Sequence, residues 1–297
     1  MSLQVDTAYV QAYRANVSLL VQQKGSRLRN AVRMEPQNAE FEFYDRIGAT
    51  EAQEITGRHQ DTPLQSTPHD RRRVSLRDFD WADLIDRQDK LRMLMDPTSA
   101  YAQNAVFAMG RKMDDLIIDA AFGTSYSGKT GATSVTFPAA NTIAYNYVES
   151  GSAAAGNLTI GKLRRASEIL NSYDNDPDEQ RFMTVTANSL HSLLRNTEVT
   201  NADYNVIKAL VEGKVDTFMG FTFIRTQRLQ TNSSGYRRHI AWCKSGLLLA
   251  VSQEPQIDVG PRRDKRNSVQ VYVNMGLGAT RMEEEKVIEV LVDESVL

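Results

Sequence analysis

Eight residues near the middle of the chain match the phosphate-binding loop of nucleotide hydrolases letter for letter. Residues 123–130 read Gly-Thr-Ser-Tyr-Ser-Gly-Lys-Thr, which fits the pattern G-x-x-x-x-G-K-[ST]. Such a loop needs a buried strand before it and a helix after it, because the first N–H groups of the helix bind the phosphate. Here a strong helical pattern precedes the motif, and the negative carboxyl end of that helix would repel phosphate. The sequence therefore favours an ordinary loop with Lys129 in solvent, and a P-loop-like nucleotide-binding enzyme is the minor alternative.

The other residues that could do chemistry do not form a recognised constellation. The turn Asp174–Glu179 begins like a calcium loop, but it lacks the glycine after the third acidic position and the distant glutamate. The histidines, at positions 59, 69, 191 and 239, do not have metal-ligand spacing. Cys243, the single cysteine, is expected to be a small buried hydrophobe. We therefore expect no catalytic residue, no cofactor and no metal.

Charged side chains are concentrated instead on two predicted strands. Phe41 and Phe43 alternate with glutamates, and residues 71–77 alternate again, whereas residues 50–70 have almost no large apolar side chains. A two-stranded ribbon is marginal alone in water, so we expect it to lie on another surface. Its arginine run has three readings: a solvated strand, a phosphate contact, or ion pairing to an acidic strip on another copy. The candidates for contact between subunits are Glu40, Glu42, Glu51, Glu54, Arg58, Arg71, Arg72, Arg73 and Arg77.

The composition is that of a globular protein. The chain has 297 residues, of which 41% are hydrophobic and 24% charged, with a formal net charge of −2. This near-neutral charge argues against a dedicated nucleic-acid binder, which would carry a basic excess. No apolar run approaches the roughly 20 residues of a membrane span, and the first 20 residues lack the pattern of a signal peptide.

The periodicity predicts a mixture of helices and strands. An amphipathic helix is expected over residues 9–21, a short helix over 81–95 and a long helix over 98–122, with Gly123 at its end. Further helices and strands follow without strict βαβ alternation, which favours an α+β fold. Among these, residues 156–174 predict a helix with Leu163, Ile169 and Leu170 facing inward, and residues 201–213 predict another short helix.

Four stretches, taken in this order, resemble the major capsid proteins of tailed bacteriophages, which have the Hong Kong 97-type capsid fold. None of the four is a catalytic signature, so the specificity of the resemblance lies in their joint presence over most of the chain. They are residues 44–48 (YDRIG), 86–123 (DRQDKLRMLMDPTSAYAQNAVFAMGRKMDDLIIDAAFG), 201–229 (NADYNVIKALVEGKVDTFMGFTFIRTQRL) and 273–290 (VNMGLGATRMEEEKVIEV).

The resemblance implies a division of the chain into an N-terminal arm, an extended β-hairpin loop, a peripheral domain with a long spine helix, and an axial domain. The arm would comprise residues 1–35 and the extended loop 50–77. The peripheral domain would comprise 36–49, 78–157 with the spine helix at 98–122, and closing strands in 252–297, and the axial domain would comprise 158–251.

It also implies a structural, non-enzymatic protein of the virion. Identical subunits, as pentamers and hexamers, would self-assemble in the host cytoplasm into an icosahedral phage head enclosing double-stranded DNA, which they contact non-specifically and without a membrane. In one known member a lysine of the extended loop bonds covalently to a neighbour, but no lysine lies between Lys24 and Lys90 here. We therefore expect non-covalent cohesion, a separate scaffolding protein and a portal protein, and leave open a cement protein. The shell of a cellular nanocompartment is the nearest alternative.

Overall fold

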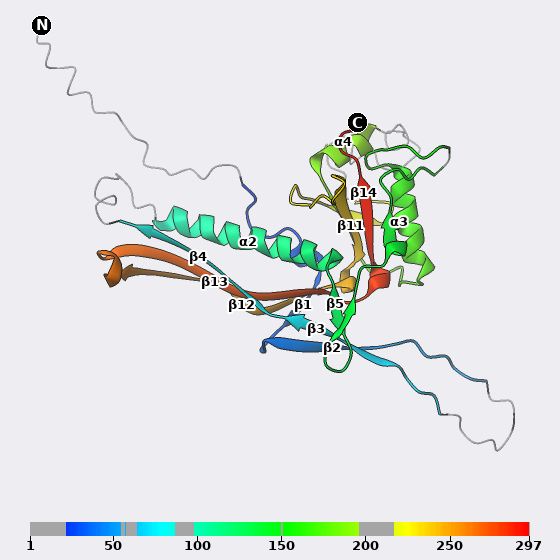
Figure 1. Cartoon of the computed structure of the whole chain (residues 1–297), viewed down its shortest axis with the longest axis horizontal. Coiled ribbons are helices and arrows are strands. Elements are labelled where there is room, and N and C mark those ends of the chain that lie inside the picture. Colours follow the sequence, from blue (N-terminus) through cyan, green and yellow to red (C-terminus); the bar gives the residue numbers. More distant parts are fainter. Residues whose placement is uncertain are drawn as a thin grey trace, which may run out of the picture.

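The computed structural model describes residues 22–54, 57, 64–86, 98–149, 151–195 and 217–296. It confirms the α+β fold, with three β-sheets and the α-helices α2, α3 and α4 in the described ranges. Figure 1 shows a long part, along which α2 lies, and a compact part at one end that carries α3 and α4. The strands β2 and β3 run outward from the region where the two parts meet. No helix in these ranges is long and apolar enough to cross a membrane.

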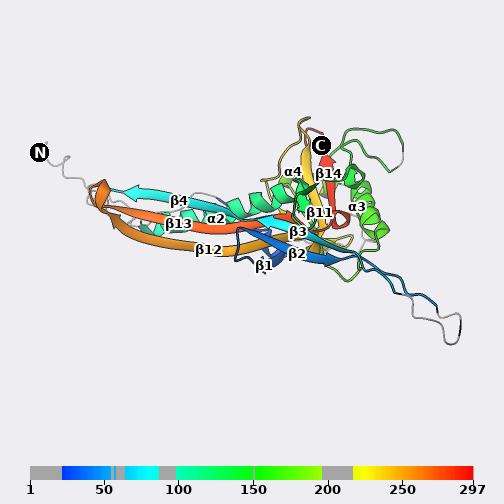
Figure 2. The same cartoon turned by 60° about the horizontal axis from the view of Figure 1, so that its bottom comes forward.

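The long part is a four-stranded sheet with the order β1-β12-β13-β4. β12 and β13 form a long antiparallel hairpin, β4 pairs antiparallel with β13, and β1 pairs parallel with β12. α2 (Thr98–Phe122) lies along one face of this sheet (Figures 1 and 2), which confirms the helix predicted over 98–122. The strands are β1 (Arg33–Pro36), β4 (Arg77–Ile85), β12 (Leu247–Arg262) and β13 (Ser268–Arg281).

An apolar stripe holds α2 on this sheet. Met109, Met113 and Ile117 are buried and share one core cluster with residues of β12 and β13. The helix is followed by Gly123, as predicted. A Cβ atom at this position would lie 2.8 Å from the carbonyl oxygen of Asp119, so a larger residue would force a shift.

The compact part is a six-stranded sheet with the order β7-β14-β11-β8-β10-β9. Its helix α3 buries Leu163, Ile169 and Leu170, which confirms their predicted inward direction. The helices are α3 (Ile160–Ser172) and α4 (Ala187–Arg195), and the strands are β7 (Thr142–Ile143), β8 (Arg181–Val185), β9 (Thr217–Phe218), β10 (Phe221–Arg225), β11 (Arg237–Cys243) and β14 (Val287–Val292).

Strand β11 separates two cores. Successive side chains of a strand point to opposite faces of its sheet. Accordingly, Ile240 and Trp242 belong to the core beneath α2, whereas Ala241 and Cys243 belong to the core of the six-stranded sheet. Cys243 is buried, as expected, and burial raises the pKa of its thiol to about 11.

The third sheet has the order β2-β3-β5-β6 and begins at the β2–β3 hairpin. β2 (Phe41–Ile47) and β3 (His69–Ser75) pair in antiparallel register from Phe41↔Ser75 to Ile47↔His69, which confirms the two strands read from the alternation. β5 (Ser125–Ser127) and β6 (Thr133–Val135) complete the sheet.

One expectation is wrong, and the expected domain boundaries stay a prediction. Residues 81–85 are not the start of a helix but the end of β4, because Phe79, Trp81 and Ile85 share one face at a period of two and pair with β13. The expected boundaries between the domains do not follow the sheets. β12 crosses the boundary placed at 251, β14 and β7 belong to the six-stranded sheet, and residues 33–35 of the expected arm lie in β1.

Other predictions fall outside the described residues. These are the helix over 9–21, the rest of the helix over 81–95, the helix over 201–213, and Arg58 and His59.

Candidate functional site: the anchorage of the β2–β3 hairpin

The motif at residues 123–130 forms part of the sheet that carries the β2–β3 hairpin. Its residues 125–127 are β5, which pairs with β3 on one side and with β6 on the other. The backbone N–H of Gly128 donates to Oδ1 of Asp70 at 3.3 Å, and Lys129 is exposed. The motif is followed by β6 and not by a helix, so it lacks the helix N-terminus whose N–H groups bind the phosphate in a phosphate loop.

At the base of the hairpin, Arg72 is directed into the protein. Its side chain is 0% exposed and forms an ion pair with Glu284, whose side chain is 15% exposed. Its Nε donates to the carbonyl oxygen of Met282 at 3.0 Å. The expectation that Arg72 contacts another subunit is therefore wrong, because this guanidinium is enclosed by its own chain. It joins β3 to the segment between β13 and β14.

Arg46, on the neighbouring strand β2, makes a second link to the same segment. Its Nη1 donates to the carbonyl oxygen of Met282 at 2.6 Å, and its Nε donates to Oδ2 of Asp70 at 3.0 Å. Burial raises the pKa of Asp70, but the hydrogen bonds from Arg46 and from the backbone outweigh this and hold that pKa below its usual value. Asp70 stays ionised at neutral pH and ties β2, β3 and the turn at Gly128 together.

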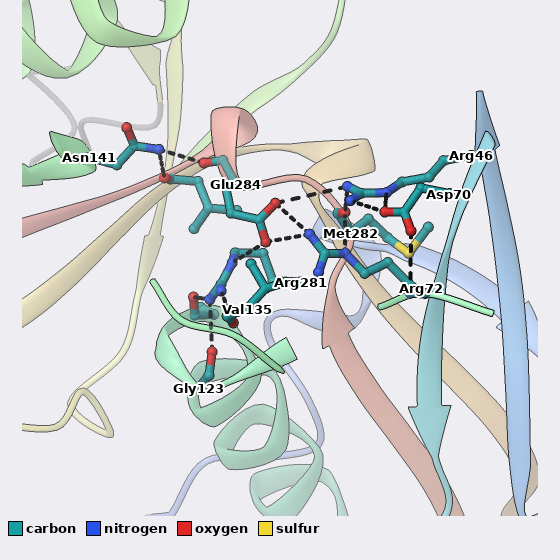
Figure 3. Close-up of polar contacts among 12 residues, drawn as sticks. Arg46, Asp70, Arg72, Gly123, Val135, Asn141, Arg281, Met282 and Glu284 are labelled. Carbon is teal, nitrogen blue, oxygen red and sulfur yellow. Dashed lines mark hydrogen bonds and ion pairs between the residues drawn. The ribbon is translucent and has the colours of Figure 1, made fainter. Parts of the chain in front are cut away.

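Arg281 occupies the other side of Glu284 (Figure 3). Its side chain is 0% exposed, and its Nε lies 3.4 Å from Oε1 of Glu284. Its Nη1 donates to the carbonyl oxygens of Ala121 and Gly123 at 2.8 and 2.9 Å, and Nη2 donates to that of Val135 at 3.3 Å. Arg281 thus binds the carboxyl end of α2, where a cation is favourable for the helix dipole.

The segment that carries Glu284 is fixed in turn to the six-stranded sheet. Nδ2 of Asn141 donates to the carbonyl oxygen of Glu284 at 2.6 Å, and the hydroxyl of Tyr173 donates to Oδ1 of Asn141 at 3.0 Å. Through Glu284, the hairpin, the end of α2 and the six-stranded sheet meet at one point.

This cluster, defined by Arg46, Asp70, Arg72, Arg281 and Glu284, is called the anchor cluster below. Burial lowers the pKa values of Arg72 and Arg281, while Glu284 opposes that shift in both. A guanidinium remains charged in proteins, so Glu284 is a required counter-ion for two enclosed cations.

Close packing also fixes the hairpin on the long sheet. Val74 of β3 is buried with Leu248 and Ala250 of β12 in a small core of its own. Gly278 of β13 makes room for this contact, since a Cβ atom there would lie 2.6 Å from Cγ1 of Val74. The base of the hairpin is therefore held by both charge and shape.

The remaining candidates for contact between subunits lie in different surroundings. Arg71 forms an exposed ion pair with Asp45, its Nε lying 3.0 Å from Oδ1, and Arg73 is stacked over the ring of Tyr126 at 4.6 Å. These two arginines are thus occupied within the chain. Glu42 is half-buried, whereas Glu40, Glu51, Glu54 and Arg77 are exposed.

Sequence reasoning found Arg72 but missed its partners. Glu284 lies 212 positions further along the chain, in a run of three glutamates that has no special spacing. Arg46 and Arg281 stand in strand-like stretches where an arginine is ordinarily exposed. Among the described residues, no group of three or more His, Cys, Asp or Glu side chains is placed to hold a metal ion.

Comparisons with known proteins identify the fold and the family. The capsid of cyanophage P-SCSP1u superposes with a TM-score of 0.75 at 13% identity, covering 97% of this chain and 94% of that one. The capsid of Ralstonia phage GP4 gives 0.74 at 11% identity over 96% and 95% of the two chains. The capsid of Helicobacter pylori bacteriophage KHP30 gives 0.74 at 9% identity over 99% and 98%.

These likenesses show the Hong Kong 97-type fold. A search among curated proteins finds no significant match. The family model described as phage capsid protein matches residues 5–294, which is nearly the whole sequence. The chain therefore belongs to the phage capsid protein family and is a structural major capsid protein of a tailed-phage head.

Proposed function

We propose that identical copies of this chain assemble as pentamers and hexamers into an icosahedral shell around double-stranded DNA, and that the chain has no enzymatic activity. In this proposal the long sheet with α2 is the peripheral domain and the six-stranded sheet is the axial domain. The β2–β3 hairpin is the extended loop that reaches a neighbouring subunit. A separate scaffolding protein and a portal protein assist assembly.

The observation that carries the proposal is the contrast between the base and the flanks of the hairpin. The base is held by the anchor cluster, whereas every described side chain of residues 48–54 and 64–68 is exposed. Leu64 is 97% exposed and Ile47 66% exposed, so the subunit leaves these apolar side chains of the hairpin uncovered. A firmly held base with uncovered flanks suits a segment that is to be buried by a second copy.

The test is to shorten the hairpin without touching its anchorage. Deleting residues 51–66 keeps Asp70 in β3 and the bond from the N–H of Gly48 to the carbonyl oxygen of Pro68. We expect the subunit to fold with an unchanged melting temperature but to form no closed shells in sedimentation and negative-stain images. The matched control removes residues 152–155, an exposed stretch of the compact part, and should leave assembly intact. Shells of normal size from the shortened protein would refute this role of the hairpin.

The absence of enzymatic activity has its own test at the motif of residues 123–130. Purified protein should hydrolyse ATP and GTP no faster than buffer, and Lys129→Ala should change nothing, because Lys129 is an exposed residue in the turn between β5 and β6. Nucleotide hydrolysis that disappears in Lys129→Ala would contradict this part of the proposal.

A further inference from the structure

The turn that joins β12 to β13 is an exposed feature with a strongly basic sequence. Residues 261–267 read Pro-Arg-Arg-Asp-Lys-Arg-Asn, and all seven are exposed. Four of them are cationic and one is acidic. Figures 1 and 2 show this turn at the far end of the long sheet, whereas the β2–β3 hairpin extends beyond the opposite end of the molecule. The turn therefore presents its charge away from the body of its own subunit.

Only one of the four cations is paired. Arg262 donates from Nε to Oδ1 of Asp264 at 2.9 Å and from Nη2 to Oδ2 at 2.5 Å. These bonds from Arg262, together with the nearby charge of Lys265, hold the pKa of Asp264 below its usual value. Arg263, Lys265 and Arg266 have no ion-pair partner among the described residues. The turn thus offers three positive charges to another molecule.

The backbone of the turn is held in an unfavourable conformation at one of these cations. Arg266 has φ +53° and Asn267 has φ +57°. Asparagine tolerates this left-handed region, but arginine does so at a cost that glycine would avoid. A strained residue that keeps a long charged side chain in solvent is a reason to look for the group that the side chain meets.

The complementary surface lies on the flank of the β2–β3 hairpin. Glu51 and Glu54 are exposed, and residues 48–54 and 64–68 contain no lysine or arginine. This acidic flank cannot reach the basic turn of the same subunit, because the two lie at opposite ends of the molecule. In an assembly of identical copies, however, one end of a subunit can meet the other end of its neighbour in a repeated head-to-tail contact.

We propose that the basic turn (Arg263, Lys265 and Arg266) of one copy binds the acidic flank (Glu51 and Glu54) of the β2–β3 hairpin on a second copy. This inference rests on the proposed assembly into shells and names the surface that the hairpin meets. Exposed ion pairs contribute little affinity individually, but they select the register of the contact, and the shell repeats them in every subunit.

The experiment reverses each patch separately and then both together. The variants are R263E/K265E/R266E for the turn, E51R/E54R for the flank, and the combination of all five changes. We expect each patch variant to lower the yield of closed shells by about tenfold or more, and the combination to restore it. The matched controls are Lys244→Glu and Asp176→Arg, two exposed charges elsewhere, which should assemble normally. Unchanged melting temperatures exclude misfolding as the cause.

The outcomes are distinguishable. Normal shells from both patch variants, or no rescue by the combination, would overturn the pairing while leaving the proposed assembly intact. Normal shells that retain less DNA in the turn variant alone would show that the turn binds phosphate, which also overturns the pairing. If the unchanged protein forms no shells or capsomers even with its scaffolding protein, the proposed function itself fails.

Discussion

Two buried polar clusters of the described residues accommodate burial in opposite ways. The anchor cluster encloses Arg72 and Arg281, which keep their charges and need Glu284 between them. The cluster of the six-stranded sheet instead encloses His239 and Lys162, whose charges burial makes unfavourable. One cluster therefore depends on a counter-ion, and the other depends on the protonation state of its members.

The second cluster is built around His239, which is 0% exposed. Its ring nitrogens lie 2.8 Å from the carbonyl oxygen of Thr184 and 3.0 Å from Oγ of Ser189. Burial lowers the pKa of His239 to about 4. Nearby, Nζ of Lys162 donates to three backbone carbonyl oxygens, and burial lowers its pKa to about 8. Buried titratable groups of this kind make the stability of a domain depend on pH, whereas arginines do not.

The largest expected effect comes from Glu284→Gln. The change keeps the size of the side chain but leaves Arg72 and Arg281 enclosed without their counter-ion. Breaking a buried pair by removing one partner costs about 3–5 kcal/mol. We expect a fall of that size in the free energy of unfolding, measured with urea.

The matched control is Glu285→Gln, which removes the neighbouring, exposed carboxylate. It should change the free energy of unfolding by less than about 0.5 kcal/mol. Equal effects of the two substitutions would show that the anchor cluster is not the source of stability that its geometry indicates.

A smaller effect is expected from acid acting on His239. In the unfolded chain this imidazole takes up a proton near pH 6.5, but in the folded protein it does so only near pH 4. The unfolded state binds more protons between these values. The stability contributed by neutral His239 is therefore complete above pH 6.5 and is lost as the pH falls towards 4. The loss amounts to at most about 3 kcal/mol.

The measurement is the free energy of unfolding between pH 4 and 7.5 for the unchanged protein, His239→Gln and His191→Gln. Arg237 and Lys162 face His239 and disfavour its charge, whereas Glu294 favours it, so all three stay in place. His239→Gln should flatten the curve between pH 4.5 and 6.5. His191→Gln, at an exposed position, should not. An equally steep curve without His239 would assign the acid response to other groups.

The smallest effect on the free energy of unfolding is expected from the loss of an exposed ion pair of the hairpin. Asp45→Asn breaks the pair with Arg71, whose side chain is 42% exposed against 67% for Asp45. Exposed pairs of this kind contribute roughly 0–1 kcal/mol, and salt screens them. Unfolding at low and at 0.5 M salt should differ little between the variant and the unchanged protein. A loss as large as that of Glu284→Gln would remove the distinction between enclosed and exposed arginines.

The sequence predicted the elements whose periodicity is long and regular. The helix over 98–122 and the strands β2 and β3 were found because an apolar stripe or a strict alternation extends over many residues. For residues 81–85 the sequence predicts a helix, since Trp81, Leu84 and Ile85 also fit a helical spacing. This segment forms a strand because it pairs with β13, and the pairing cannot be predicted from the residues of the segment alone.

The anchor cluster was beyond prediction for a related reason. Arg72 and Glu284 meet only because β3 packs against β12 and β13, and neither residue has a local signature of burial. An arginine run reads as a solvated face until the fold shows which side chain points inward. The alternating pattern of β3 does indicate which way Arg72 points, since Arg72 lies on the same face of the strand as the buried Val74.

The two-sided strand β11 has a consequence for how the shell could change shape. Neighbouring residues of β11, such as Ala241 and Trp242, pack into opposite cores. The two parts of the subunit therefore cannot rotate against each other without disrupting the packing of this shared strand. Each subunit should therefore move as a rigid body. Expansion or contraction of the head would then occur by movement at the interfaces between subunits and by movement of the β2–β3 hairpin.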